Sequence, residues 1–373
     1  MLFIKIPQNN LLKRPLRTLL TCFGVVLGVA SFVALVGLSR GVERAWITGL
    51  NEKGTHILGL RKGAVEILTA TLDENLGGDL RTVHGVAEVS GELVDITQLD
   101  EGPTVLISGW PSDSNLWRTL HISVGGAATD LTPGHVVVGQ TVAGAIPCDI
   151  GHVLGIGGRR YTVHAVHKSK GTLNNNTIIM RLDDMQQMTG KAGRVTGFNI
   201  RLNQADDPDQ VADVLVRLKK RFGSLTFHQT REVADNNKIL KLFRAIAWGT
   251  STIAIVISAF IVLNTLLMSV SERKREIGIF CALGWKPSRI ILMIGCEAFC
   301  ITAVGGLVGC LVGGVGLHWL VGATELQAYI EPDLNLQLIV EILIASVGLG
   351  TMVSIYPAWR ALQINPTEAL RYE

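Results

Sequence analysis

The sequence has few charged residues, few aromatic residues and few cysteines. Charged residues make up 17% of the 373 residues and aromatic residues 6%, whereas soluble domains carry about a quarter charged residues. Of six cysteines only Cys148 lies between residues 41 and 244, so no disulfide can form within that region. No Cys/His spacing typical of zinc and no G-x-x-x-x-G-K-[ST] phosphate loop occurs. We therefore expect no metal, no cofactor and no catalytic residue in this chain.

Charge is scarce because four long stretches almost lack it. Each exceeds the roughly 20 apolar residues that cross the core of a bilayer. Residues 18–39 and 245–271 carry no charge, and the other two stretches contain one acid each, Glu297 and Glu341. The first is longer than the apolar region of a signal peptide, about 7–15 residues, which favours an uncleaved anchor over a cleaved leader.

The sequence thus predicts an α-helical membrane protein with four transmembrane helices and a mixed α/β extracytoplasmic domain inserted between the first and the second. The expected segments are an N-terminal interfacial segment at 1–17, a span at 18–40, the outer domain with a helical stalk at 41–244, a span at 245–271, a coupling helix at 272–289, spans at 290–320 and 334–359 joined by an outer loop at 321–333, and a tail at 360–373.

The placement of lysine and arginine predicts the orientation. The region 41–244 holds 22 basic and 22 acidic residues, so it is balanced. Of the twelve remaining basic residues, eleven lie before the first span, between the second and third, or after the fourth. Arg40 lies at the far end of the first span, and residues 321–333 contain none. By the positive-inside rule both termini and residues 272–289 face the cytoplasm. The net charge of +3 reflects this sidedness and gives no reason to expect nucleic-acid binding.

Short β-rich runs bounded by turn residues predict the sheet of the outer domain. The expected strands are Val86–Leu99, Thr104–Trp110, His135–Gly139, Tyr161–His167, Thr177–Arg181 and Gly197–Leu202. Asp207 can cap a helix that presents an apolar face and ends near Gly223. The first span is expected to continue as a helix to about Lys53.

A compact charged segment follows the second span directly. It begins Glu272-Arg273-Lys274-Arg275-Glu276 and ends at Gly284. Ile279 and Leu283 lie one turn apart, which predicts an amphipathic helix of about three turns. A solvated loop that obeys the positive-inside rule would explain the basic residues, but it would not explain the paired acids or the bounding glycine.

The segment Ser271–Ile279, followed by Ala282-Leu283-Gly284, resembles the signature of the FtsX-like permease family, the membrane subunits of MacB/LolC/LolE/FtsX-type ABC transporters. Two further regions are similar to that family: residues 14–29, with Arg14-Pro15-Leu16-Arg17, and residues 357–373, with Pro357-Ala358-Trp359-Arg360-Ala361. The sequence departs from the family pattern at Phe280-Cys281 and at Trp285.

The resemblance implies a bacterial inner-membrane protein that pairs with a second permease subunit, identical or different. It implies a separate cytoplasmic ABC ATPase, which would bind ATP and Mg²⁺, and a possible periplasmic adaptor or substrate. The positions implied to couple to the ATPase are Glu272, Arg273, Arg275, Glu276, Gly278 and Gly284.

Two functions remain open. The first is a permease subunit that passes ATP-driven motion to the outer domain and so exports or extracts an amphipathic substrate, such as a lipoprotein, lipid, peptide or drug. The alternative is an FtsX-like mechanotransmission subunit that regulates a periplasmic cell-wall hydrolase without transport. A membrane-anchored sensor is disfavoured because each cytoplasmic segment is short.

The third and fourth spans contain further candidates. Gly305, Gly309 and Gly313 recur at intervals of four, which suits close helix packing within one subunit or a dimer interface equally. Glu297 is a candidate functional acid within the membrane. Pro357 is expected to end the fourth span, because its ring disrupts a helix interior, and residues 365–372 are expected to form a short helix.

Overall fold

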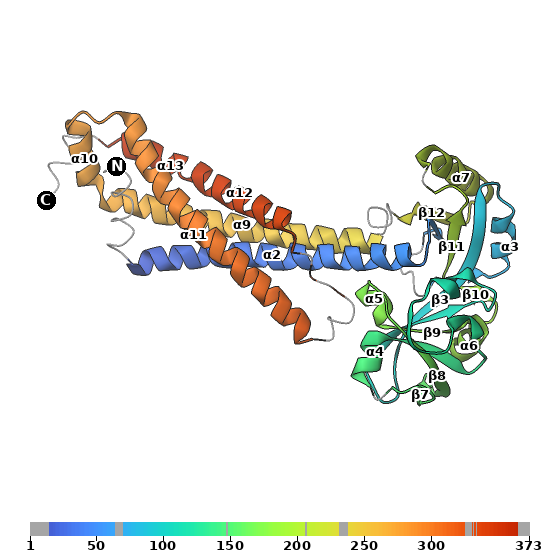
Figure 1. The fold of residues 1–373 in the computed structure, drawn as a ribbon. Coiled ribbons are helices and arrows are strands. Elements are labelled where there is room, and N and C mark those ends of the chain that lie inside the picture. The colour runs from blue at the N-terminus through green and yellow to red at the C-terminus, as the bar shows by residue number, and fades with distance from the viewer. Residues whose placement is uncertain are drawn as a thin grey trace. The chain divides into compact units, whose positions relative to one another are not determined.

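The computed structural model describes residues 15–63, 70–146, 148–205, 207–230, 238–324, 330, 332 and 334–364. The chain divides into two compact units (Figure 1). A helical unit contains residues 1–40, 244–323 and 332–373, and an α/β unit contains residues 41–243 and 324–331. The predicted helix at residues 365–372 lies outside the described residues.

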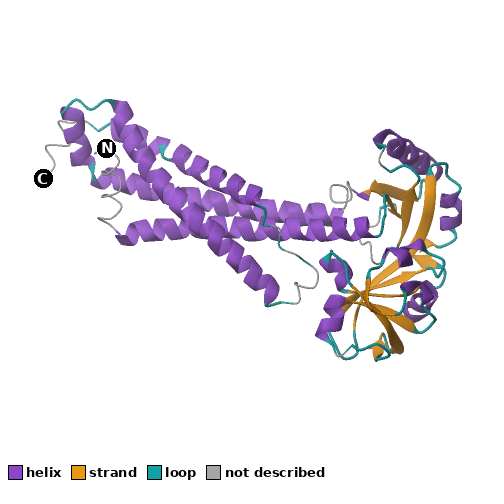
Figure 2. Ribbon diagram, in the orientation of Figure 1, coloured by secondary structure: helices purple, strands orange, loops and turns teal. Residues whose placement is uncertain are grey.

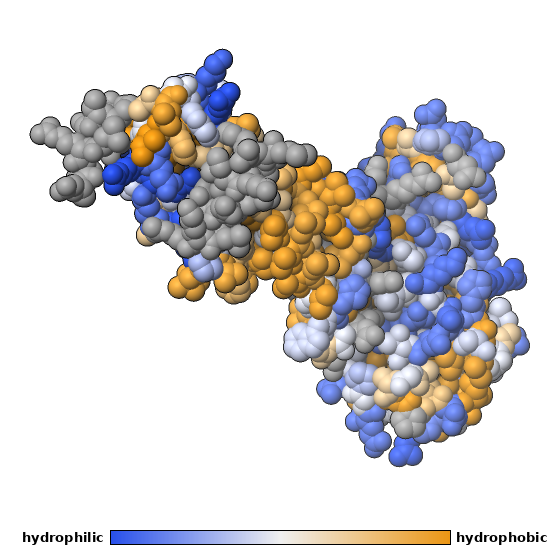
Figure 3. Space-filling model, turned by 60° about the vertical axis from the view of Figure 1, so that its left-hand side comes forward, coloured by the Kyte–Doolittle hydropathy of each residue, from blue (hydrophilic) through white to orange (hydrophobic). Residues whose placement is uncertain are grey.

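Long helices build the helical unit (Figure 2). Its elements are α2 (Pro15–Glu52), α9 (Lys238–Glu272), α10 (Lys274–Ala282), α11 (Pro287–Gly322), α12 (Leu336–Val353) and α13 (Ile355–Leu362). The end of α2 after residue 40 and the start of α9 before residue 244 belong to the α/β unit. Among the described residues, four helices are long and apolar enough to cross a membrane: Pro15–Glu52, Leu240–Glu272, Pro287–Gly322 and Leu336–Leu362. Figure 3 shows apolar surface over the middle of the helical unit. Helix α2 continues beyond its apolar part to Glu52, close to the predicted end at Lys53.

The prediction that Pro357 ends the fourth span is wrong. Helix α12 ends at Val353, and α13 begins at Ile355 and runs through Pro357. A proline lacks the N–H that would bond to the carbonyl four residues earlier, and its ring collides with that carbonyl. The residue four before Pro357 is Val353, so the interruption falls one turn before the proline instead of at it.

Among the described residues of the α/β unit, ten strands form one sheet, in the order β12-β1-β11-β3-β4-β9-β6-β8-β5, with β7 beside β8. The strands are β1 (Ile57–Arg61), β3 (Val86–Gln98), β4 (Thr104–Trp110), β5 (Ile122–Gly125), β6 (His135–Gly139), β7 (Val153–Ile156), β8 (Arg159–His167), β9 (Thr177–Arg181), β11 (Gly197–Leu202) and β12 (Leu225–Gln229). A second sheet pairs β2 (Leu72–Asp73) with β10 (Arg194–Val195). The helices are α3 (Leu76–Arg81), α4 (Gln140–Ala145), α5 (Thr172–Asn175), α6 (Leu182–Thr189) and α7 (Pro208–Arg221).

Strand β3 joins two halves of the large sheet. Its residues up to Glu92 pair with β11, and its residues from Leu93 pair with β4. One half of the sheet therefore contains β12, β1 and β11, and the other contains β4, β9, β6 and β8 (Figure 1).

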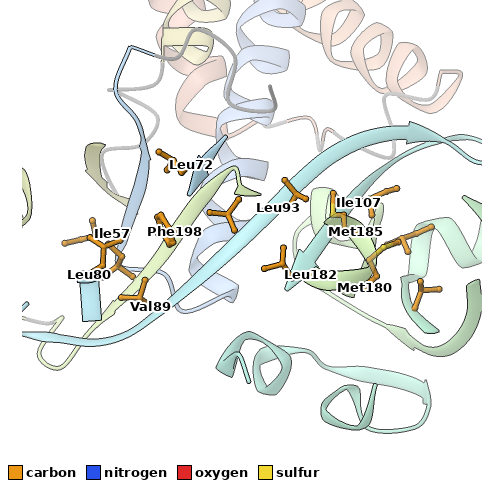
Figure 4. Close-up of a cluster of buried hydrophobic side chains, with 14 of the residues drawn as sticks. Ile57, Leu72, Leu80, Val89, Leu93, Ile107, Met180, Leu182, Met185 and Phe198 are labelled. Atoms are coloured by element: carbon orange, nitrogen blue, oxygen red, sulfur yellow. The ribbon is translucent and has the colours of Figure 1, made fainter. Parts of the chain in front are cut away.

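One hydrophobic core runs along both halves. Phe198 and Leu80 are fully buried in the first half, and Ile107 and Met185 in the second. Figure 4 shows Leu93 of β3 between these two groups of side chains. The core thus continues through the strand that the halves share.

The fold class predicted from the sequence is confirmed: four apolar helices, with a mixed α/β domain inserted between the first and the second. Four strands have the predicted bounds: β4, β6, β9 and β11. Helix α7 begins as predicted, because the side chain of Asp207 accepts a hydrogen bond from the backbone N–H of Asp209.

Candidate coupling site

The charged segment does not form the single three-turn helix that the sequence predicted. Helix α9 ends at Glu272, Arg273 leaves the helical conformation with φ −106° and ψ 19°, and α10 then has 9 residues. At 3.6 residues per turn this is about two and a half turns. Glu272 and Glu276 therefore lie on different helices. The break between α9 and α10 at Arg273 coincides with two ion pairs within the helical unit, Arg17–Glu272 and Arg273–Glu297.

Glu272 and Arg273 hold this corner of the chain in place. Nη1 of Arg17 in α2 lies 2.7 Å from Oε2 of Glu272. Nη1 of Arg273 lies 3.5 Å from Oε2 of Glu297 in α11, and the hydroxyl of Ser269 donates to Glu297 at 3.2 Å. Glu297 is 4% exposed. A buried carboxylate requires a charged or hydrogen-bonding partner, and Arg273 and Ser269 supply these partners to Glu297.

The outer face of α10 combines charges with apolar side chains. Lys274, Arg275 and Glu276 are exposed, as are Ile279 at 39% and Leu283 at 72%. On the opposite face Ile277 is 1% exposed and Gly278 is buried. The helix therefore packs on the unit through Ile277 and Gly278 and leaves an amphipathic face uncovered.

A tight turn ends this element. Gly284 has φ +79°, a conformation that a residue with a Cβ adopts only with strain. The turn brings the rings of Phe280 and Trp285 into a stack, with centroids 4.5 Å apart and an interplanar angle of 17°. These two positions both depart from the family pattern, and the structure shows that they contact each other.

The glycine row of α11 packs against α2 of the same chain. A Cβ on Gly309 would lie 2.7 Å from Cβ of Val29, and one on Gly313 would lie 2.7 Å from the carbonyl oxygen of Ala30. Gly305 meets Val25 in the same way, at 2.8 Å. This face of α11 is occupied within the subunit, so a dimer contact would have to use another surface.

Sequence reasoning missed the attachment of the end of α2 to the sheet. Nζ of Lys53 lies 2.6 Å from Oε1 of Glu92, which also accepts hydrogen bonds from Ser108 and, at 3.0 Å, from Nε1 of Trp110. The other carboxylate oxygen accepts from Nδ2 of Asn199 at 2.7 Å. Glu92 is the last residue of β3 to pair with β11, so this network lies where the two halves of the sheet meet.

The environment of Glu92 keeps its carboxylate ionised. Burial alone would raise its pKa, but the charge of Lys53 and the hydrogen bonds from Lys53, Ser108 and Trp110 outweigh burial and lower the pKa to about 2. In the sequence, the sign of this network was an acid among the apolar residues of a predicted strand. A pattern of that kind does not reveal which distant side chains will surround the acid.

Glu52, the last residue of α2, forms a second attachment. Its carboxylate accepts hydrogen bonds from the hydroxyl of Ser169, from the backbone N–H of Lys170 at 2.6 Å and from Nδ2 of Asn174 at 2.9 Å. Glu52, the last residue of α2, and Lys53, which follows it, thus bind two different parts of the α/β unit.

Comparison with known proteins agrees with this architecture. Residues 248–366 match the FtsX-like permease C-terminal family, and residues 18–218 match the MacB-like periplasmic core domain. The second match alone covers more than half of the chain.

Curated relatives give the same assignment. An uncharacterized ABC transporter permease of Methanocaldococcus jannaschii is 24% identical over 98% of this chain and 96% of its own length. The macrolide export ATP-binding/permease protein MacB of Shewanella oneidensis is 26% identical over 96% of this chain. The lipoprotein-releasing system transmembrane protein LolC of Xylella fastidiosa is 24% identical over 94% of this chain and 92% of its own length. The chain spans only 58% of the length of the MacB relative.

These matches define a membrane permease of the ABC transporter class. Within that class, the chain belongs to the FtsX-like permease family and carries a MacB-like periplasmic core domain.

Proposed function

We propose that this chain is the permease subunit of a MacB/Lol-type ABC transporter and that the exposed face of α10 binds a separate cytoplasmic ATPase. One observation carries the proposal: α10 presents Arg275, Glu276 and Leu283 outward while its entry residue Arg273 is tied to Glu297. A helix fixed to the ends of α9 and α11 passes a displacement to both of them.

In this proposal both termini and α10 lie in the cytoplasm and the α/β domain lies outside the cell membrane. ATP and Mg²⁺ would bind to the ATPase and not to this chain. Relatives are named for macrolide export and for lipoprotein release, so the proposed cargo is an amphipathic molecule. Two permease subunits, identical or different, would flank the route that the cargo takes.

Co-purification of the full chain with candidate ABC ATPases tests this function. Arg275→Glu should abolish association, because the side chain of Arg275 lies on the exposed face of α10. Glu276→Lys should abolish it too, although this variant also removes the 3.1 Å ion pair between Glu276 and Arg273. Lys220→Glu is a matched control, since it reverses one exposed charge on α7. Arg273→Glu is unsuitable, because Arg273 pairs inside the unit with Glu297 at 3.5 Å and also with Glu276 at 3.1 Å.

Equal recovery of the ATPase with wild type and both α10 variants would refute the assignment of α10 as the docking helix. If the ATPase binds, its hydrolysis rate separates the two functions. Stimulation by an amphipathic substrate supports transport, whereas stimulation only by a periplasmic hydrolase supports the regulatory alternative.

A further inference from the structure

A cavity of about 430 Å³ lies within the α/β unit. Its wall is formed by the end of α2, by the ends of β4 and β8, and by β9, and it includes Glu52, Trp110, His167 and Ile179. Cavities that bind small molecules measure about 300–1,000 Å³, so this one has the size of a ligand site. The coupling function proposed above does not use it.

His167 gives the cavity an unpaired hydrogen-bond acceptor. The residue is 1% exposed, its ring bonds to the backbone of Thr177, and its Nε2 has no hydrogen-bond partner among the described residues. Burial lowers the pKa of His167 to about 4, so the ring is neutral at pH 7. In the neutral form one ring nitrogen donates and the other accepts. With the donor engaged by the Thr177 carbonyl, Nε2 is left as the acceptor.

An acceptor of this kind requires a donor from elsewhere. A buried polar atom that is left unpaired destabilises the fold. A hydroxyl group of a bound molecule, directed at Nε2 of His167, would satisfy it.

Two lysines give the same cavity a positive charge. Lys168 and Lys170 directly follow β8, line the cavity and are exposed. Among the described residues neither is in an ion pair. The acid in the wall, Glu52, accepts hydrogen bonds from the hydroxyl of Ser169, the backbone N–H of Lys170 and Nδ2 of Asn174. These neutral donors leave its charge in place, so two unpaired lysine charges stand against one carboxylate. The third lysine of the wall, Lys53, is neutralised by Glu92. An anion is therefore the complementary ligand.

The wall also offers an apolar surface. Trp110 is 1% exposed and Ile179 3%, and both line the cavity. A short carbon skeleton can pack there.

We infer that this cavity binds a small anion that also carries a hydroxyl group, the chemistry of a glycerol phosphate headgroup. The anion pairs with Lys168 and Lys170, the hydroxyl donates to Nε2 of His167, and the carbon skeleton packs against Trp110 and Ile179. The same headgroup chemistry occurs in a soluble metabolite and at the end of an anionic lipid.

Calorimetric titration of the full chain in nanodiscs of neutral phosphatidylcholine tests this site. The probes are glycerol 3-phosphate, methyl phosphate, which lacks the hydroxyl groups, and glycerol, which lacks the charge. We expect saturable binding of glycerol 3-phosphate, weaker binding of methyl phosphate and none of glycerol. Absence of saturable binding of glycerol 3-phosphate at concentrations on the order of 10 mM would overturn the inference.

Two variants assign the contacts. Lys168→Gln/Lys170→Gln should weaken the binding of both anions about tenfold or more, because charge-assisted bonds are lost. The control Lys219→Gln/Lys220→Gln removes two exposed charges from α7 and should leave the affinity unchanged. His167→Leu should abolish the preference for glycerol 3-phosphate over methyl phosphate. If the cavity variant and the α7 variant bind equally well, the site is not where we place it.

The membrane composition distinguishes the two sources of the headgroup. In nanodiscs that contain phosphatidylglycerol, a weaker apparent affinity for glycerol 3-phosphate means that lipid headgroups compete for the cavity. An unchanged affinity identifies a soluble ligand. Both outcomes retain the inferred chemistry.

Discussion

Lys53 and Glu92 form a buried ion pair, 2.6 Å between Nζ and Oε1, one residue beyond the end of α2. The side chain of Lys53 is 17% exposed and that of Glu92 7%. The pair fixes the end of a helix that contains the first apolar span to the strand that both halves of the sheet share.

This pair should make the α/β unit sensitive to acid. The folded pKa of Glu92, about 2, lies below its ordinary value of 4.5. The contribution to stability is therefore present above pH 4.5 and is lost as the pH falls toward 2. It is on the order of 3 kcal/mol. Thermal unfolding of the full chain in detergent between pH 7 and pH 3 should show about three-fifths of this loss, because pH 3 lies about three-fifths of the way from 4.5 to 2.

Lys53→Gln should destabilise the unit at pH 7 by about 3–5 kcal/mol, because an uncompensated buried charge remains. The control is Lys191→Gln. Lys191 pairs with Asp95 of the same strand at 2.7 Å, but its side chain is 28% exposed, and exposed pairs contribute about 0–1 kcal/mol. A similar loss of unfolding free energy in both variants would show that burial does not set the strength of the Lys53–Glu92 pair.

The pair between Arg273 and Glu297 should contribute more than a pair of equal length at the surface. Both Arg273–Glu297 and Arg40–Glu341 measure 3.5 Å, but the side chains of the first are 14% and 6% exposed and those of the second 36% and 50%. Arg273→Met should cost about 3–5 kcal/mol and Arg40→Met less than about 1 kcal/mol. Double-mutant cycles on thermal unfolding measure both couplings.

Helix α11 provides a matched pair of glycines. Gly313→Ala should destabilise the helical unit by about 1–3 kcal/mol through overpacking against Ala30. Gly316→Ala should be neutral or stabilising by up to about 1 kcal/mol, because nothing lies within 4 Å of the added Cβ. Thermal unfolding gives the difference, and light scattering gives the oligomeric state. Dissociation of a dimer by Gly313→Ala without loss of stability would contradict the packing described here.

The turn at Gly284 should be necessary for ATPase docking. Gly284→Ala forces a Cβ into φ +79°, at a cost of about 1 kcal/mol or more, and should weaken the Phe280–Trp285 stack. Gly284→Asn should retain more of the ATPase association, because asparagine tolerates this conformation better. Equal association of both variants in co-purification would mean that the turn does not position α10.

Local sequence patterns were sufficient to predict much of the fold. The β6 run His135–Gly139 and the β9 run Thr177–Arg181 are apolar and bounded by turn residues, so their limits could be read directly. Strands β1, β5, β7 and β12 were missed, because short strands at or near a sheet edge show little alternation. The interruption at Ser354 was missed because a proline acts on the preceding turn of the helix.

The site was harder to predict than the fold. The sequence located the charged segment, but its pattern gave Glu272, Arg273 and Arg275 the same role. Their roles differ in the structure because Arg17 and Glu297, distant in sequence, pair with the first two. Periodicity within one segment cannot reveal a partner on another helix.

Strand β3 also bears on how the α/β unit unfolds. Because its two ends belong to opposite halves of the sheet, neither half retains a complete set of paired strands if the other is lost. The unit should unfold in one cooperative transition. A fragment cut between the halves would expose a strand edge whose backbone groups are free to pair with another chain. The architecture thus disfavours stepwise loss of one half, whether by proteolysis or by truncation of the gene.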